Sequence, residues 1–140
     1  MELSIIVPCY NEEKNIIHLF NEIKQCLYKK KIKYEIIFVD DGSSNKTLKK
    51  LKLLKEENKI IKLLKHKSNK GIATAWKTGL NQSQGKYILT IDADLQYSPK
   101  DILKLYKKIK TSTADLVQGN RIFEENRTVR TFLSKSFSKI

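Results

Sequence analysis

The feature that most constrains this chain is a regular alternation of short apolar runs with longer amphipathic stretches. The short runs predict buried strands, and apolar positions spaced three and four residues apart predict helices that pack on them. The strands are expected at Leu3–Pro8, Tyr34–Asp40, Ile60–Lys65, Tyr87–Asp92 and Asp115–Gly119. The helices are expected at Asn15–Tyr28, about Ser44 to Glu57, Ile72–Asn81 and Pro99–Lys110, and a last amphipathic segment begins near Val129. This alternation predicts a three-layer α/β fold, in which helices cover both faces of a mostly parallel sheet.

The length of 140 residues fits a single domain. No apolar run approaches the roughly 18 residues that a membrane span needs. The chain enters its first expected strand at once, which argues against a signal peptide. Cys9 and Cys26 lack the spacing of a metal or redox motif, so we expect a reduced, cytoplasmic setting.

The formal net charge of +13 is carried almost entirely by lysine. Several of these lysines, such as Lys49, Lys50, Lys52 and Lys55, are spread around one expected helix, as on a solvated helix face. Attraction to an anionic membrane surface is the alternative that the charge leaves open. No basic run is interleaved with aromatic residues, so nucleic acid is not an expected partner.

Two carboxylates, Asp92 and Asp94, follow the apolar run that begins at Tyr87. Alternate side chains of a strand point the same way, so the two carboxylates are expected to converge beyond the sheet. Ligands of open α/β sheets bind beyond the carboxyl ends of the strands, and paired carboxylates suit Mg²⁺ or Mn²⁺. Gln96 offers a further oxygen ligand. The alternative is a pair of turn aspartates before the helix that Ser98 is expected to cap.

The first strand ends in another polar segment. Pro8 is expected to stop the strand, and Tyr10 offers an aromatic face to a nucleobase. Asn11 is expected to cap the following helix. Glu12 is expected to accept hydrogen bonds from a base or ribose, or else to serve the positive end of the helix dipole.

The second strand ends in two adjacent aspartates. Asp40 is placed to accept a hydrogen bond from the ring N–H of uracil or guanine. Asp41 with Gly42 reads as a turn, in which Ser43 or Ser44 caps the next helix. Both interpretations hold together if the two aspartates divide the roles.

A third segment precedes the expected helix at Ile72. Lys70 and the N–H groups of the helix start, including that of Gly71, are suited to phosphate, although the Walker A pattern is absent. The small residues that follow, such as Ala75 and Gly79, also fit plain packing of a helix against the sheet.

Taken in order along the chain, these signals resemble family 2 glycosyltransferases with the GT-A fold, a Rossmann-like nucleotide-binding fold. The four segments that carry the resemblance are Ser4–Glu12, Phe38–Ser44, Asn69–Gly79 and Tyr87–Pro99. The sequence Asp-Ala-Asp-Leu-Gln followed by Ser-Pro is most similar to the subgroup that transfers sugars to polyprenyl phosphates, such as dolichyl-phosphate mannosyltransferase.

The resemblance implies a role for each matched residue. A nucleotide pocket is implied for Pro8, Tyr10, Glu12, Asp40, Asp41, Lys70, Gly71 and Asp92. Asp92 would contact the ribose or metal-bound water, Asp94 would ligate the metal and act in catalysis, and Gln96 would be a further ligand. The metal set is thus Asp92, Asp94 and Gln96, with Mg²⁺ or Mn²⁺ as cofactor.

Arg121 and Arg130 match the arginines that clamp phosphates in that subgroup, and they complete the expected catalytic set. Two positions depart from the pattern. Glu124 stands where arginine is common, and Asn126 stands where aspartate is common, so Asn126 cannot be a base.

The expected function is metal-dependent, inverting transfer of a sugar from a UDP- or GDP-sugar to a polyprenyl phosphate or a glycan. The family's catalytic domain continues past Ile140, so residues 1–140 are expected to be one catalytic domain whose acceptor part is missing. A non-catalytic or inactive nucleotide-sugar-binding module is the alternative. A nucleotidyltransferase would instead open with a glycine-rich basic loop after the first strand. We expect the protein at the inner face of the membrane, with self-association left open.

Overall fold

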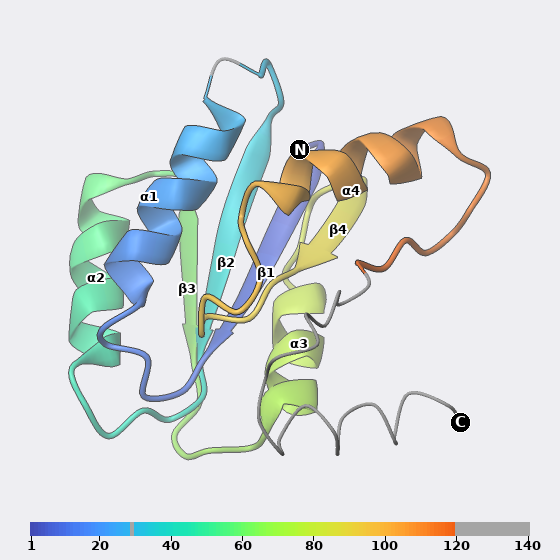
Figure 1. The fold of residues 1–140 in the computed structure, drawn as a ribbon. Coiled ribbons are helices and arrows are strands. Elements are labelled where there is room, and N and C mark those ends of the chain that lie inside the picture. The colour runs from blue at the N-terminus through green and yellow to red at the C-terminus, as the bar shows by residue number, and fades with distance from the viewer. Residues whose placement is uncertain (29, 120–140) are drawn as a thin grey trace, which may run out of the picture.

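Four parallel strands form the sheet of this chain, in the order β3-β2-β1-β4 (Figure 1). The computed structural model describes residues 1–28 and 30–119. The strands are β1 (Leu3–Cys9), β2 (Tyr34–Asp40), β3 (Ile61–Lys65) and β4 (Tyr87–Thr90). The helices are α1 (Ile16–Leu27), α2 (Thr47–Glu57), α3 (Ile72–Leu80) and α4 (Asp101–Thr111). Strands and helices alternate along the chain, as the apolar pattern predicts.

The helices cover both faces of the sheet, which confirms the three-layer α/β prediction. On one face, side chains of β1 and β2 pack with side chains of α1, α2 and α4. This cluster includes Phe38 from β2, Leu19 from α1 and Ile102 from α4. On the other face, Ile6, Ile37 and Val39 pack against Ala75 of α3. β1 is buried along its whole length because it is central in the sheet and covered on both faces.

A close approach of backbones fixes the start of β4. A Cβ on Gly85 would lie 2.4 Å from the backbone nitrogen of Ser4, so only glycine fits there. The buried carboxylate of Glu35 accepts hydrogen bonds from the Ser4 hydroxyl at 2.6 Å and from the Gln84 N–H at 2.8 Å. These contacts anchor the loop before β4, and therefore the segment that carries Asp92 and Asp94.

Four predictions about the strands and helices need correction. Pro8 does not stop the first strand, because β1 continues to Cys9 and Pro8 pairs in register with Val39. Asp115–Gly119 is not a strand: it joins no ladder with the sheet, and Leu116 is exposed. β4 ends at Thr90 rather than Asp92: its last register pair with β1 is Thr90 with Ile6, the Ile91 N–H still donates to the Ile6 carbonyl at 3.1 Å, and the chain then turns at residues 93–94. α4 begins at Asp101, and Ser98 caps the turn before it by accepting the N–H of Lys100 at 3.3 Å. The expected segment at Val129 lies outside the described residues.

Candidate active site

Polar segments from four separate parts of the chain surround one hollow of about 320 Å³. It lies where β1, β2 and β4 end, the edge at which open α/β sheets bind ligands. Its lining residues are Pro8, Cys9, Tyr10, Glu12, Asp41, Asn69, Gly71, Ile72, Ala75, Asp92, Ala93 and Asp94. The structure thus brings together seven of the residues singled out in the sequence, namely Pro8, Tyr10, Glu12, Asp41, Gly71, Asp92 and Asp94. Asp40, Lys70 and Gln96 do not line the hollow, and Arg121 and Arg130 lie outside the described residues.

The loop after β1 is held in place by the loop after β2. Asn11 has a φ of 58°, in the left-handed region that asparagine tolerates. Its backbone N–H donates to the Ser43 hydroxyl at 3.0 Å, and its side-chain oxygen accepts the Ser44 N–H at 2.9 Å. Asn11, Ser43 and Ser44 therefore join the two loops, and the expectation that they cap helices is wrong. The cap before α2 comes from Asn45, whose side chain accepts the Thr47 N–H at 3.0 Å.

Tyr10 and Glu12 present different chemistry to the hollow. The Tyr10 side chain is 47% exposed, so its ring is accessible to a ligand. Glu12 Oε2 accepts a hydrogen bond from the Asn15 side chain at 2.7 Å, which fixes the direction of the carboxylate. An accessible aromatic face beside a fixed carboxylate can stack a flat ring and accept its N–H or O–H groups.

Asp41 is the acceptor around which the neighbouring loop is folded. Its Oδ1 accepts the Lys70 N–H at 2.9 Å, and its Oδ2 accepts the Gly71 N–H at 2.9 Å. Its Oδ1 also lies 2.6 Å from Nδ1 of His66. Burial alone would raise the pKa of Asp41, but the hydrogen bonds from His66, Lys70 and Gly71 outweigh it and lower the pKa below its ordinary value.

His66 is a residue that sequence reasoning did not single out. Its side chain is 8% exposed, and Nε2 lies 2.9 Å from the Thr78 hydroxyl on α3. A single histidine between Lys65 and Lys67 carries no motif, and its partners lie 25 and 12 residues away in sequence. The only hint in the sequence was the pair of adjacent aspartates at the end of β2, because a buried carboxylate needs a hydrogen-bond donor.

Asp40 differs from its neighbour Asp41 in its hydrogen bonding, because one of its carboxylate oxygens accepts no hydrogen bond from the described residues. The residue is 1% exposed, and Oδ1 has no hydrogen-bond partner within residues 1–28 and 30–119. Asp40 pairs in register with Cys9 of β1, a lining residue of the hollow. A buried acceptor without a donor is costly, so this oxygen is suited to receive an N–H from a ligand or a water.

The Cys9 thiol at the floor of the hollow is not a nucleophile. Burial raises its pKa well above the ordinary value, and the charges of Asp40 and Glu12 raise it further. The thiol is therefore held in its neutral form.

Asp92 and Asp94 also line the hollow, in the segment that follows β4. Asp92 is half-buried and Asp94 is exposed, and Asp94 Oδ1 accepts the backbone N–H of Gln96 at 3.0 Å. No cluster of three or more His, Cys, Asp or Glu residues suited to a metal occurs in the described part of the chain. Two carboxylates facing an open hollow nevertheless fit Mg²⁺ or Mn²⁺, which keep water and substrate phosphates as further ligands.

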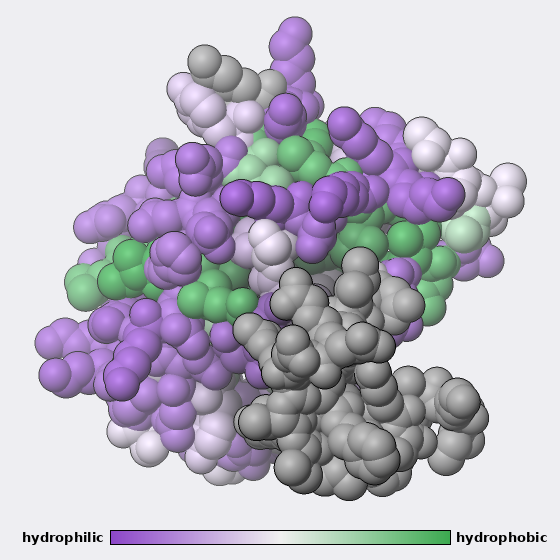
Figure 2. All heavy atoms as spheres, in the orientation of Figure 1, coloured by the Kyte–Doolittle hydropathy of each residue, from purple (hydrophilic) through white to green (hydrophobic). Residues whose placement is uncertain are grey.

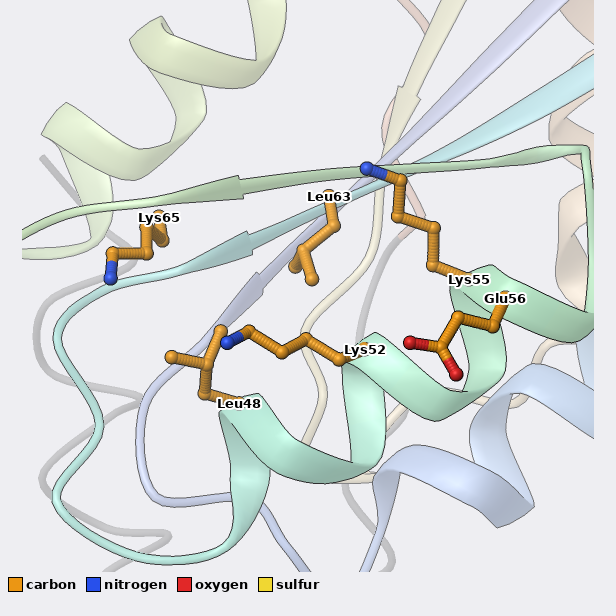
Figure 3. Close-up of a pocket in the computed structure, with 6 residues that line it drawn as sticks. All are labelled: Leu48, Lys52, Lys55, Glu56, Leu63 and Lys65. Carbon is orange, nitrogen blue, oxygen red and sulfur yellow. The ribbon is translucent and has the colours of Figure 1, made fainter.

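A larger hollow of about 400 Å³ lies away from these carboxylates, between α2 and β3 (Figure 3). Its lining combines leucine with lysine: Leu48, Lys52, Lys55, Glu56, Leu63 and Lys65. It has neither paired carboxylates nor hydrogen-bonded loops, so its size does not make it the reactive site. Hydrophilic side chains also dominate the face shown in Figure 2, consistent with lysines on solvated helix faces.

The four-stranded parallel sheet with helices on both faces defines an α/β domain of the GT-A type. The sequence matches the profile of glycosyl transferase family 2 over residues 4–139, and the chain belongs to this family. It is 35% identical over 121 residues to a dolichol-phosphate mannosyltransferase of Pyrococcus furiosus, covering 86% of this chain and 33% of that protein. The resemblance to the polyprenyl-phosphate subgroup is therefore confirmed.

Two solved structures share the fold. Staphylococcus aureus TarS 1–349 in complex with UDP-GlcNAc is 34% identical, with a TM-score of 0.62, covering 74% of this chain and 29% of that chain. The mannosyltransferase PcManGT from Pyrobaculum calidifontis in complex with GDP-Man and Mn²⁺ is 27% identical, with a TM-score of 0.64, covering 73% and 30%. The chain spans 32% to 52% of the length of the curated relatives that it matches here. Within the described residues, no helix is long and apolar enough to cross a membrane.

Proposed function

We propose that this chain is the nucleotide-sugar-binding part of an inverting, metal-dependent glycosyltransferase. The donor is a UDP- or GDP-sugar, and the acceptor is a polyprenyl phosphate or a glycan. The observation that carries the proposal is the single hollow at the strand ends, which joins an aromatic face, a fixed glutamate and a pair of aspartates. Membership of family 2 and the sugar nucleotides bound by the two structural neighbours support it.

The base and ribose occupy the side of the hollow formed by Pro8, Tyr10 and Glu12 in this proposal. Asp40 is the proposed acceptor of the ring N–H of the base, because its Oδ1 has no donor among the described residues. This oxygen is buried and Asp40 does not line the hollow, so the base has to reach past the lining residues to contact it. Both uracil and guanine carry such an N–H, so this contact fits a uridine or a guanosine donor. Asp41 is a poor candidate for the same task, since both of its oxygens already accept hydrogen bonds from the chain.

The diphosphate lies toward Asp92 and Asp94 in this proposal. A divalent cation held there, with Gln96 as a further oxygen ligand, would offset the charge of the departing nucleoside diphosphate. The Lys70 and Gly71 amides donate to Asp41, so a phosphate contact from this loop would come from the Lys70 ammonium.

The acceptor reaches the sugar from the open side of the hollow and displaces the nucleotide directly, which inverts the anomeric centre. A phosphate acceptor is already anionic, so it needs no general base, whereas a glycan hydroxyl needs one. The chain's similarity to a dolichol-phosphate mannosyltransferase favours the phosphate acceptor. Arg121 and Arg130 remain the predicted phosphate clamps.

A lipid-phosphate acceptor would bring the protein to the inner face of a membrane. The net charge of +13 favours contact with an anionic surface. Lysines beside the α2–β3 hollow, such as Lys52, Lys55 and Lys65, form no salt bridge with any residue that the structure describes. They are therefore available for such a contact.

Calorimetric titration of UDP and GDP into the protein, with Mn²⁺ and then with EDTA, tests the proposal. We expect metal-dependent binding of one of the two nucleotides. CDP is the matched control for UDP, because cytosine lacks the ring N–H that Asp40 would accept. Equal binding of UDP and CDP would contradict the role of Asp40, and absence of any nucleotide binding would contradict the proposed function.

The same preparation separates the enzyme from a non-catalytic module. We expect release of nucleoside diphosphate from the bound sugar nucleotide when a polyprenyl phosphate is added. Metal-dependent binding without any release under these conditions would favour the binding module instead.

A further inference from the structure

His66 sits behind the wall of the hollow rather than in it. The side chain is not among the lining residues, yet it contacts Asp41, which is one of them. Its other ring nitrogen meets Thr78 on α3, and its backbone N–H donates to the Asp40 carbonyl at 2.8 Å. One imidazole thus connects the end of β2 to α3, the helix that follows the loop containing Asn69 and Gly71.

The hydrogen-bond partners define the state of the ring. The Asp41 carboxylate can only accept, so Nδ1 of His66 carries a proton. The Thr78 hydroxyl can donate to Nε2 or accept from it, because the hydroxyl rotates. The contacts of His66 are therefore satisfied whether the ring is neutral or charged.

The loop held by this network has little freedom of its own. Gly71 has a φ of 86° and is the N-cap residue immediately before α3, and its N–H donates to Asp41. A Cβ on Gly42 would lie 2.5 Å from the carbonyl carbon of Ser68, so the two loops are in backbone contact. Gly71, a lining residue, is therefore placed through Asp41, and the side-chain oxygen of Asn69, also in the lining, accepts the same Gly71 N–H at 3.0 Å.

We propose that His66 is a positioning residue for the nucleotide site: by orienting the Asp41 carboxylate between β2 and α3, it holds the Asn69–Gly71 wall in its binding conformation. The effect on nucleotide affinity rests on the proposed function, whereas the effect on the loop does not. Without the imidazole, Asp41 can rotate away from the loop. The Lys70 amide then loses its acceptor, and the Gly71 amide keeps only the Asn69 side-chain oxygen, which accepts it at 3.0 Å. The Asn69–Gly71 segment is then ordered only when the ligand binds, and the free energy spent on this ordering lowers the affinity.

The test compares two substitutions at one position. His66→Phe keeps a ring of similar size but removes both hydrogen bonds, while His66→Gln retains an amide that can donate to Asp41 and bond to Thr78. Each is examined by amide hydrogen exchange at Lys70 and Gly71, by thermal unfolding and by calorimetric titration of UDP and GDP with Mn²⁺. His18→Phe is the matched control, because His18 is an exposed histidine on α1.

We expect His66→Phe to accelerate exchange of the Lys70 and Gly71 amides and to weaken nucleotide binding about tenfold, the loss typical of one hydrogen bond to a charged group. His66→Gln should restore most of both properties, and His18→Phe should change neither. The imidazole nitrogen shifts of His66 should report a proton on Nδ1. A residue that only fills space would be replaced adequately by phenylalanine.

Two results would overturn the proposal. The first is unchanged exchange of the Lys70 and Gly71 amides in His66→Phe, whatever the nucleotide affinity. The second is failure of His66→Gln to restore what His66→Phe loses. If His66→Phe does not fold, Thr78→Val removes one hydrogen bond at constant shape, and the same two amides decide the outcome. If the wild-type chain binds no nucleotide, the proposed function fails, and the exchange of these amides still decides whether His66 holds the loop.

Discussion

Two pairs of acidic residues meet at the carboxyl end of this sheet, and they are built in different ways. Asp40 and Asp41 are 1% and 3% exposed, and Asp41 is tied into the chain by three hydrogen bonds. Asp92 is half-buried and Asp94 is exposed, in a turn where one hydrogen bond runs from Gln96 to Asp94. Both pairs border the hollow through at least one member.

The difference shows that neighbouring carboxylates of one site need not share a task. A buried carboxylate is costly unless donors compensate the loss of water, and three donors do so at Asp41, which therefore holds the surrounding loops together. Asp94 is exposed and needs no such compensation, so its carboxylate suits a cation. We therefore expect Asp41 to govern stability and Asp94 to govern metal-dependent binding.

The largest effect is expected from Asp41→Ala. The substitution removes the acceptor of two backbone amides and of the His66 ring, so the free energy of unfolding should fall by about 3 kcal/mol. Urea unfolding followed by circular dichroism measures the loss. Asp94→Ala is the matched control, and it should change the same free energy by less than about 0.5 kcal/mol because the side chain is exposed. Similar losses in the two variants would contradict the division of roles.

The next effect concerns binding rather than stability. Asp94→Ala should weaken Mn²⁺-dependent nucleotide binding about a hundredfold, because it removes one of two carboxylates from the proposed metal site. Titration with Mn²⁺ and with EDTA separates the metal-dependent part of the affinity. Asp101→Ala is the control, since Asp101 is a surface carboxylate paired with Lys104 on α4. Retained affinity in Asp94→Ala would exclude Asp94 as a ligand.

The sequence predicted the fold well because burial imposes a simple pattern. Four strands and four helices follow from apolar periodicity, and the polar segments at their ends predicted which residues border the hollow. The expected strand at Asp115–Gly119 was wrong, because an apolar run becomes a strand only when it finds a ladder to join.

The sequence could not show how the site is held together. Asn11 and His66 make their decisive contacts with residues 33 and 25 positions away, and such pairs are fixed by the tertiary structure. Helix capping was the local explanation for Asn11, and it failed because a left-handed turn directs the side chain to Ser44 instead. The sequence suggested that Asp40 and Asp41 divide the roles, but only the hydrogen bonds show that Asp41 is the one tied into the loops.

A titration in acid sharpens the comparison further. The pKa of Asp41 is lowered from 3.8 in the folded chain, so the folded state binds fewer protons here than the unfolded state. The stabilisation is present above the unfolded pKa and is lost as the pH falls through the folded pKa. We therefore expect stability to decline more steeply in the wild type than in Asp41→Asn between about pH 5 and pH 2.

Unfolding free energies measured across this range provide the check. The pKa of Glu35 is also lowered, since hydrogen bonds from Ser4 and Gln84 and the charge of Lys62 outweigh its burial. That contribution is common to both proteins and cancels in the difference. Parallel curves for the wild type and Asp41→Asn would mean that the Asp41 network does not favour the charged carboxylate.

The smallest effect is expected from Gln96→Ala. A neutral amide oxygen attracts a divalent cation less than a carboxylate does, so its loss should weaken Mn²⁺-dependent binding only a few-fold. The contact between Asp94 and residue 96 uses the backbone N–H of Gln96 and survives the substitution. Gln96→Glu tests whether the side chain of residue 96 coordinates the metal, because a carboxylate at a ligand position should strengthen Mn²⁺ binding. If neither substitution changes the Mn²⁺ titration, the metal site consists of Asp92 and Asp94 without Gln96, and the exposed pair carries the metal alone.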